Sequence, residues 1–265
     1  MASFHKREDS LQAIPPSTWK GQKMPRFLLP CCVVTALALA DAPGPFCTAS
    51  GDGLSGYPFL ASSDVLDPGV FRVQGAVEYV DVEGAGGMFR LPLTAGYGWF
   101  ENVEVAAGVP VYLSDDAYDE TVLGSLQLGG AWKYETARGG SALRLSSGVT
   151  VPTGAEYRDP GLEFFLGAST STTFRLFRLS ASAKYVIDET RDSMRYTMGA
   201  ASYITGDIVV HGSLSGSSLG GMDLTGGLIT GPWQDIAVFA SGTAGLEGPW
   251  DFRVSAGITW TGLRF

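Results

Sequence analysis

The sequence predicts an all-β protein, a transmembrane up-and-down antiparallel β-barrel of about twelve strands. Three observations predict this fold. From Phe71 onward, apolar side chains recur at every second position in segments of about ten residues, which is the period of a strand with two different faces. Short connections alternate with longer ones between the segments. The basic side chains within the segments fall on the polar phase.

The alternation is clearest at residues 177–188, where Phe177 and Leu179 alternate with Arg178 and Ser180. We find twelve such segments, and an even number suits a barrel built from hairpins. They cover residues 71–81, 88–98, 103–113, 121–135, 141–151, 162–173, 177–188, 194–203, 207–216, 222–230, 236–244 and 251–262.

The connections predict which ends of the strands lie together. Outer-membrane barrels have short periplasmic turns and longer external loops. The tight connections are residues 99–102, 174–176, 204–206 and 231–235, and the longer or more polar ones are 114–120, 152–161 and 189–193. This rhythm predicts that both ends of the barrel sequence lie on the periplasmic side.

Charge fixes which face of each segment turns inward. Eight basic residues lie on the polar phase, and a cation facing mid-bilayer lipid costs about 2 to 4 kcal/mol. A one-residue slip of all eight would therefore cost on the order of ten to thirty kcal/mol. A soluble β-sandwich also alternates, but it would not explain an export signal, twelve even segments and aromatic side chains near the segment ends together.

The N-terminal 40 residues are predicted to be a signal peptide with an N-terminal extension. Residues 27–40 are apolar but too short for the roughly 20 residues of a spanning helix. Basic residues precede them, and the small residues Ala38 and Ala40 provide a cleavage site after Ala40. Cleavage after Ala49 and a start at Met24 rather than Met1 remain open.

The domain plan continues with residues 41–70 as a periplasmic arm or a plug segment, and residues 71–265 as the barrel. The sequence does not decide between arm and plug, although an arm is the default for an exported terminus. Cys47 could carry a lipid, but the residues before it lack the pattern that such a site needs. The three cysteines predict no disulfide framework.

Composition excludes some functions. Beyond residue 40 the chain has 13 basic and 25 acidic residues, a net charge of −12. We expect no nucleic-acid partner, because nucleic-acid binding needs basic patches.

Charged residues on the polar phase of the segments are predicted to line the lumen. They include Arg72, Glu78, Arg90, Glu104, Lys133, Arg144, Glu163, Arg178, Lys184, Arg195, Asp223 and Arg253. Glu135, Asp188, Asp207 and Asp251 share this phase, so eight acids balance eight bases. A possible cation-binding loop holds Asp115, Asp116, Asp119 and Glu120, although a solvated external loop is favoured because the spacing matches no calcium motif. We predict no metal site and no cofactor.

An outer-membrane hydrolase is the enzymatic alternative, and the sequence argues against it. His211 is the only histidine outside the signal region, and it shares a phase with Val209 and Ser213. A wall residue is favoured over a general base, so we expect no catalytic residue and no enzyme.

Three stretches resemble a known family. Residues 63–69 (SDVLDPG), 91–105 (LPLTAGYGWFENVEV) and 142–154 (ALRLSSGVTVPTG) are similar to the outer-membrane transporter family named for the phenol-degradation meta pathway. The similarity runs over most of residues 60–265, and it implies a channel-type barrel in the outer membrane of a Gram-negative bacterium.

Two functions follow as expectations. If the interior leaves a water path, the protein is a channel for small solutes, and the resemblance implies hydrophobic or aromatic ones. If the interior charges interlock, it is a closed structural or adhesive barrel. The expected partners are membrane lipid, lipopolysaccharide, a small solute, and the barrel assembly machinery acting through the last strand and Phe265. Because Leu263 and Phe265 leave the apolar phase of that strand, either a bulge lies near Gly262 or the signal is atypical.

Overall fold

The computed structural model describes most of the chain beyond the predicted signal. The described residues are 48–49, 55–57, 60–82, 86–115, 122–136, 140–153, 161–175, 177–188, 191–205, 208–233, 235–247 and 250–264. The predicted signal peptide, Cys47, Phe265 and the loop acids Asp116, Asp119 and Glu120 lie outside them.

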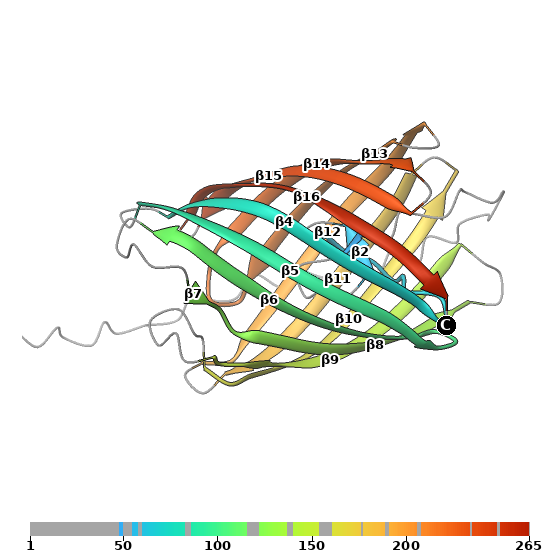
Figure 1. Ribbon diagram of the computed structural model, residues 1–265, viewed down its shortest axis with the longest axis horizontal. Coiled ribbons are helices and arrows are strands. Elements are labelled where there is room, and N and C mark those ends of the chain that lie inside the picture. Colours follow the sequence, from blue (N-terminus) through green and yellow to red (C-terminus); the bar gives the residue numbers. More distant parts are fainter. Residues whose placement is uncertain are drawn as a thin grey trace, which may run out of the picture. The chain divides into compact units, whose positions relative to one another are not determined.

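Twelve long strands form one antiparallel barrel, which confirms the predicted fold class (Figure 1). The strands are β4 (Val70–Val82), β5 (Gly86–Phe100), β6 (Val103–Asp115), β8 (Leu126–Glu135), β9 (Ser141–Val151), β10 (Glu163–Phe174), β11 (Phe177–Asp188), β12 (Ser193–Thr205), β13 (Ile208–Ser217), β14 (Met222–Trp233), β15 (Ile236–Glu247) and β16 (Trp250–Arg264). Each pairs with its sequence neighbour, and β16 closes the ring on β4 through pairs from Trp250 with Val82 to Arg264 with Val70.

The two faces of the barrel follow the alternation in the sequence. On β4, Val73 and Val77 are 42% and 51% exposed, whereas the intervening Arg72, Gln74 and Glu78 are buried. The outer phase carries exposed apolar side chains on every long strand that has described side chains throughout. The other phase is the inner face of the closed barrel, because a closed sheet has no other side on which side chains become buried.

The expected strand at residues 121–135 is interrupted. Its first part is β7 (Val122–Leu123), which pairs only with Val111 and Tyr112 of β6, and β8 then pairs with the other half of β6. Pro110 lies at the break and pairs across the sheet with Pro92 of β5. Proline has no N–H to donate, so on the side of β7 and β8 Pro110 only accepts, its carbonyl taking the N–H of Gly124 at 2.8 Å.

The register of the last strand shifts between Gly262 and Arg264. A bulge near Gly262 was one of the two explanations for the change of phase after Trp260, and the shift supports it. The extra residue moves the end of β16 onto the other phase.

Aromatic side chains of the outer phase gather near both ends of the strands. Tyr79 and Phe89 meet at one end, with ring centroids 4.9 Å apart. Trp132 and Tyr134 lie at the other end, at 6.2 Å. Two such clusters are the arrangement expected where a barrel crosses the two interfaces of a bilayer.

The turn between β5 and β6 lies at the terminal end of the barrel, which is the end where β4 begins and β16 ends. Asn102 in this turn has φ 64°, and asparagine tolerates this left-handed conformation better than most residues. The segment Ser62–Gly69, which we call the strap, leads into β4 at the same end. Gly69 has φ 78°, and it donates its N–H to the carbonyl of Gly98 on β5 at 2.8 Å.

Three short strands precede the strap. They are β1 (Thr48–Ala49), β2 (Ser55–Tyr57) and β3 (Leu60–Ala61), and they form a separate small antiparallel sheet. β3 contacts both β11 and β12 of the barrel. Within this small sheet, β3 therefore packs against the barrel.

Candidate functional site

The strap lies on the inner face of the barrel and crosses several strands. Ser62 and Ser63 are fully buried, and Leu66 is 1% exposed. The partners of the strap are inner-face side chains of β6, β9, β10 and β11. Residues 62–66 of the segment expected to be an arm or a plug therefore lie against the inner wall of the barrel.

Hydroxyl groups of β10 hold the first part of the strap. The N–H of Ser63 donates to Oγ of Ser171 at 3.0 Å, and Oγ of Ser169 donates to the carbonyl of Ser62 at 2.9 Å. Oγ of Ser62 donates to the carboxylate of Asp64 at 2.9 Å. The buried backbone of the strap thus finds hydrogen-bond partners on the barrel wall, which a buried segment requires.

Asp64 of the strap contacts two arginines of the barrel wall. Nη1 and Nη2 of Arg178 donate to its two carboxylate oxygens at 2.5 and 2.9 Å. Nη1 of Arg144 donates to its backbone carbonyl at 3.3 Å. Arg178 and Arg144 come from β11 and β9, so they grip Asp64 from both sides of β10.

Glu104 of β6 holds the second part of the strap. Its Oε2 accepts the N–H of Leu66 at 3.3 Å, and its Oε1 accepts Nη2 of Arg72 at 3.0 Å. Glu104 and Arg72 are both fully buried. The ion pair thereby joins β4 and β6 across β5 and also fixes the strap just before it enters the barrel wall.

A second charged cluster lies on the inner face near the opposite end of the strands. The carboxylate of Glu78 on β4 accepts Nε of Arg90 at 2.5 Å and faces Nε of Arg253 at 3.4 Å. Glu78 is 2% exposed, while the arginine side chains are 25% and 16% exposed. The cluster bridges the seam between β4 and β16.

The inner face also carries a patch that the sequence analysis did not anticipate. Val209 and Ile229 are fully buried, and they cluster with five other apolar residues of β4, β12 and β15. The other members are Ala76, Ala201, Tyr203, Ala237 and Phe239. Val209 shares a phase with His211 in the sequence, but most members of the patch alternate with outer residues that are largely apolar too, so periodicity gave little sign of the patch. His211 lies beside this patch and is 2% exposed.

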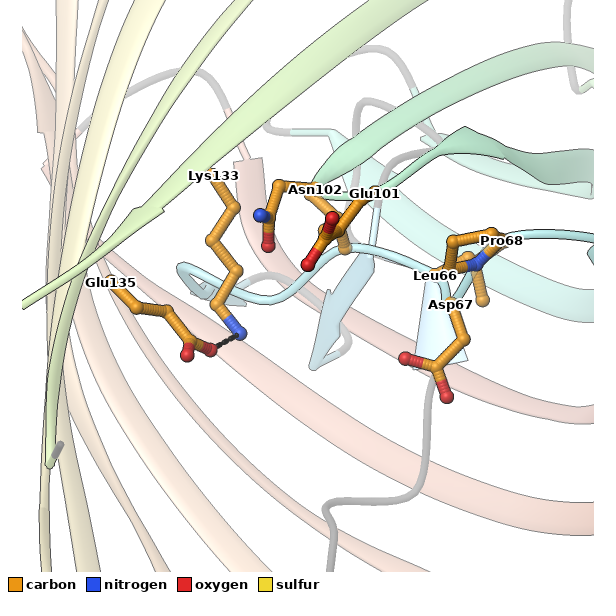
Figure 2. Close-up of a pocket in the computed structure, with 8 residues that line it drawn as sticks. Leu66, Asp67, Pro68, Glu101, Asn102, Lys133 and Glu135 are labelled. Carbon is orange, nitrogen blue, oxygen red and sulfur yellow. Dashed lines mark ion pairs between the residues drawn. The ribbon is translucent and has the colours of Figure 1, made fainter.

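A pocket of about 450 Å³ opens at the terminal end. Figure 2 shows Leu66, Asp67 and Pro68 of the strap on one side, and Glu101 and Asn102 of the β5–β6 turn and Lys133 and Glu135 of β8 on the other. Lys133 pairs with Glu135 at 2.5 Å. The strap therefore forms one wall of the opening at this end.

The twelve residues predicted to line the lumen all lie on the inner phase of their strands, at different depths. Arg72, Glu78, Glu104, Arg144 and Arg178 are buried, Arg90, Lys133, Glu163, Lys184, Asp223 and Arg253 are partly buried, and Arg195 is exposed. The structure brings Arg72 together with Glu104, and Glu78 with Arg90 and Arg253.

Sequence reasoning missed the contacts of the strap residues with the barrel wall. Ser62, Ser63, Asp64 and Leu66 lie in a segment without alternation, so no strand pattern assigned them a face. The predicted cation loop cannot be placed: Asp116, Asp119 and Glu120 lie outside the described residues, as does the side chain of Asp115. Within the described ranges, no group of three or more His, Cys, Asp or Glu side chains could hold a metal ion.

Lys184 lies over the ring of Phe165 on the inner face, with Nζ 4.5 Å from the ring centroid.

Among the described residues, no helix is both long enough and apolar enough to span a membrane.

Comparison with known proteins supports the fold. No model of a known protein family matches the chain, and no curated protein matches it. An outer-membrane channel from Pseudomonas putida F1 is similar in structure, with a TM-score of 0.63 and 11% identity over 76% of this chain and 98% of the channel. The NanC porin gives 0.53 and 10% over 72% and 98%.

The KdgM porin, solved in complex with disordered oligogalacturonate, is also similar, with a TM-score of 0.57 and 6% identity over 71% of this chain and 98% of the porin. The structural similarity shows that the chain has the fold of these outer-membrane barrels. At identities this low, it shows the fold alone.

Proposed function

We propose that this protein is a channel of the bacterial outer membrane through which small solutes pass by diffusion. One observation carries the proposal. The closed barrel has an apolar outer belt, while its inner face carries ion pairs and hydroxyl groups. A barrel of this kind suits a lipid surround and a polar path through the middle. The structurally similar barrels are an outer-membrane channel and two porins, which supports this proposal.

The finer parts of the proposal rest on the sequence. The resemblance to the meta-pathway transporter family favours small hydrophobic or aromatic solutes. The twelve inner charged residues would line the path and tune its selectivity. Both ends of the barrel would face the periplasm, and lipopolysaccharide and the barrel assembly machinery would be its partners.

A closed structural barrel is the second candidate, and the strap favours it. Ser62 to Leu66 lie across the inner face and are hydrogen-bonded to four strands. If the strap never moves, it narrows the path at the terminal end.

Single-channel recording on the purified protein in planar bilayers tests the proposal. The channel predicts stable, stepwise conductance that scales with salt concentration. A heat-denatured sample, which has lost the barrel, serves as the control. A folded barrel that inserts into the bilayer but passes no current would contradict the channel proposal and favour the closed structural barrel.

A further inference from the structure

The strap raises the question of what Arg178 is built to bind. We propose that Arg178 forms a carboxylate-binding site, beside which Arg144 holds the backbone carbonyl of Asp64. In this proposal the strap's own Asp64 side chain occupies the site, and a carboxylate-bearing solute entering the barrel takes its place. The binding site stands by itself, whereas the solute's entry rests on the channel function proposed above.

The geometry at Arg178 is that of carboxylate recognition. Its two terminal nitrogens each donate to one oxygen of the same carboxylate, at 2.5 and 2.9 Å. A planar guanidinium matches a carboxylate in this two-pronged way, whereas a neutral solute would satisfy one prong at most. Nη2 of Arg178 also donates to Oγ of Ser63 at 3.2 Å.

Burial strengthens the site. The side chain of Arg178 is 8% exposed and Arg144 is 1% exposed, so water screens the arginines poorly. Asp64 is more accessible, at 16%. The exchangeable partner is therefore the carboxylate, and the fixed part is the barrel wall.

Asp64 belongs to a segment that could release it. Its neighbours Ser62 and Ser63 are held to β10 by hydrogen bonds with the neutral hydroxyls of Ser169 and Ser171. Charge-assisted, two-pronged hydrogen bonds are roughly twice as strong as such neutral ones. A solute carboxylate that wins Arg178 would thus remove the strongest contact of this part of the strap.

Binding of a small carboxylate to the whole folded protein in detergent tests the site. The probe is para-fluorobenzoate, followed by fluorine NMR, and para-fluorobenzyl alcohol is the neutral probe of matched size. We expect Asp64→Ala to bind the carboxylate about tenfold more tightly than the unmodified protein, the gain if Asp64 leaves the site free about one-tenth of the time. The alcohol should bind both proteins equally.

Two further variants keep the test decisive. Adding Arg178→Lys to Asp64→Ala keeps the charge but removes the fork, and it should abolish the gain. Asp64→Asn, which keeps the shape of the side chain, should give a smaller gain and serves if the alanine variant does not fold. Equal carboxylate affinity with and without Asp64, or a gain that survives Arg178→Lys, would overturn the proposal.

The outcome is separable from the channel function. Carboxylate binding without conductance would leave the site in place and remove the channel. Conductance without a gain in carboxylate affinity would do the reverse.

Discussion

At the scale of single residues, Glu104 is a buried acid that connects two strands and the strap. It is fully buried, accepts Arg72 of β4 at 3.0 Å, and accepts the N–H of Leu66 in the strap. A buried ion pair is costly to break, because removing one partner leaves the other charge poorly compensated in a medium of low polarity.

Replacing Glu104 with glutamine tests this role. We expect the free energy of unfolding to fall by about 3 kcal/mol, since Arg72 keeps its burial and loses its carboxylate. Urea unfolding in lipid vesicles, followed by tryptophan fluorescence, measures the change. Glu135→Gln is the matched control: Glu135 also pairs with a cation but is 61% exposed, so its loss should cost about 1 kcal/mol or less. Equal losses at both positions would contradict the role of Glu104.

At the scale of elements, the seat of the strap depends on β5 having no side chain at Gly98. A Cβ at this position would press against the main chain of Asp67. The N–H of Gly69 also donates to the carbonyl of Gly98. The strap and the strand therefore meet backbone to backbone, which only glycine permits at this distance.

Gly98→Ala should therefore push the strap off its seat. We expect a loss of about 1 to 3 kcal/mol in unfolding free energy, the usual cost of overpacking. Limited proteolysis should also cut the strap faster than in the unmodified protein. Gly242→Ala on β15 is the control, because a Cβ there meets nothing within 4 Å. A strap that resists protease equally in both variants would show that Gly98 does not seat it.

The strands could be predicted from the sequence, and the strap could not, for one physical reason. A barrel strand meets lipid on one side, so its apolar residues must alternate, as Phe177 and Leu179 do. Asp64 packs against the inner wall, and its arginine partners come from β9 and β11, far away in the chain. Such contacts leave no period to read. The break between β7 and β8 was missed because Pro110, which causes it, lies on the neighbouring strand.

At the scale of the whole molecule, the apolar outer belt predicts where charge is tolerated. Ala240 lies near the middle of β15 on the outer phase, and Leu246 lies near its end and is 54% exposed. In a bilayer the depth of a side chain decides the cost of a charge, whereas a protein surrounded by water shows no such gradient.

Ala240→Arg should therefore cost about 2 to 4 kcal/mol when the barrel folds into lipid vesicles, and Leu246→Arg about 1 kcal/mol or less. Reversible folding titrations in urea measure both. Ala240→Leu controls for size and should leave stability nearly unchanged. If arginine costs the same at both positions, the outer belt does not face acyl chains.

The seam between β4 and β16 has a consequence for how the chain is assembled. The first and last long strands must find each other across nearly the whole sequence, so the ring is completed late. The strap directly precedes β4 and lies within that ring. It must already be in place when the seam zips shut, or else be threaded in afterwards past the β5–β6 turn. The order of these two events decides whether the strap already occupies the interior when the barrel first closes.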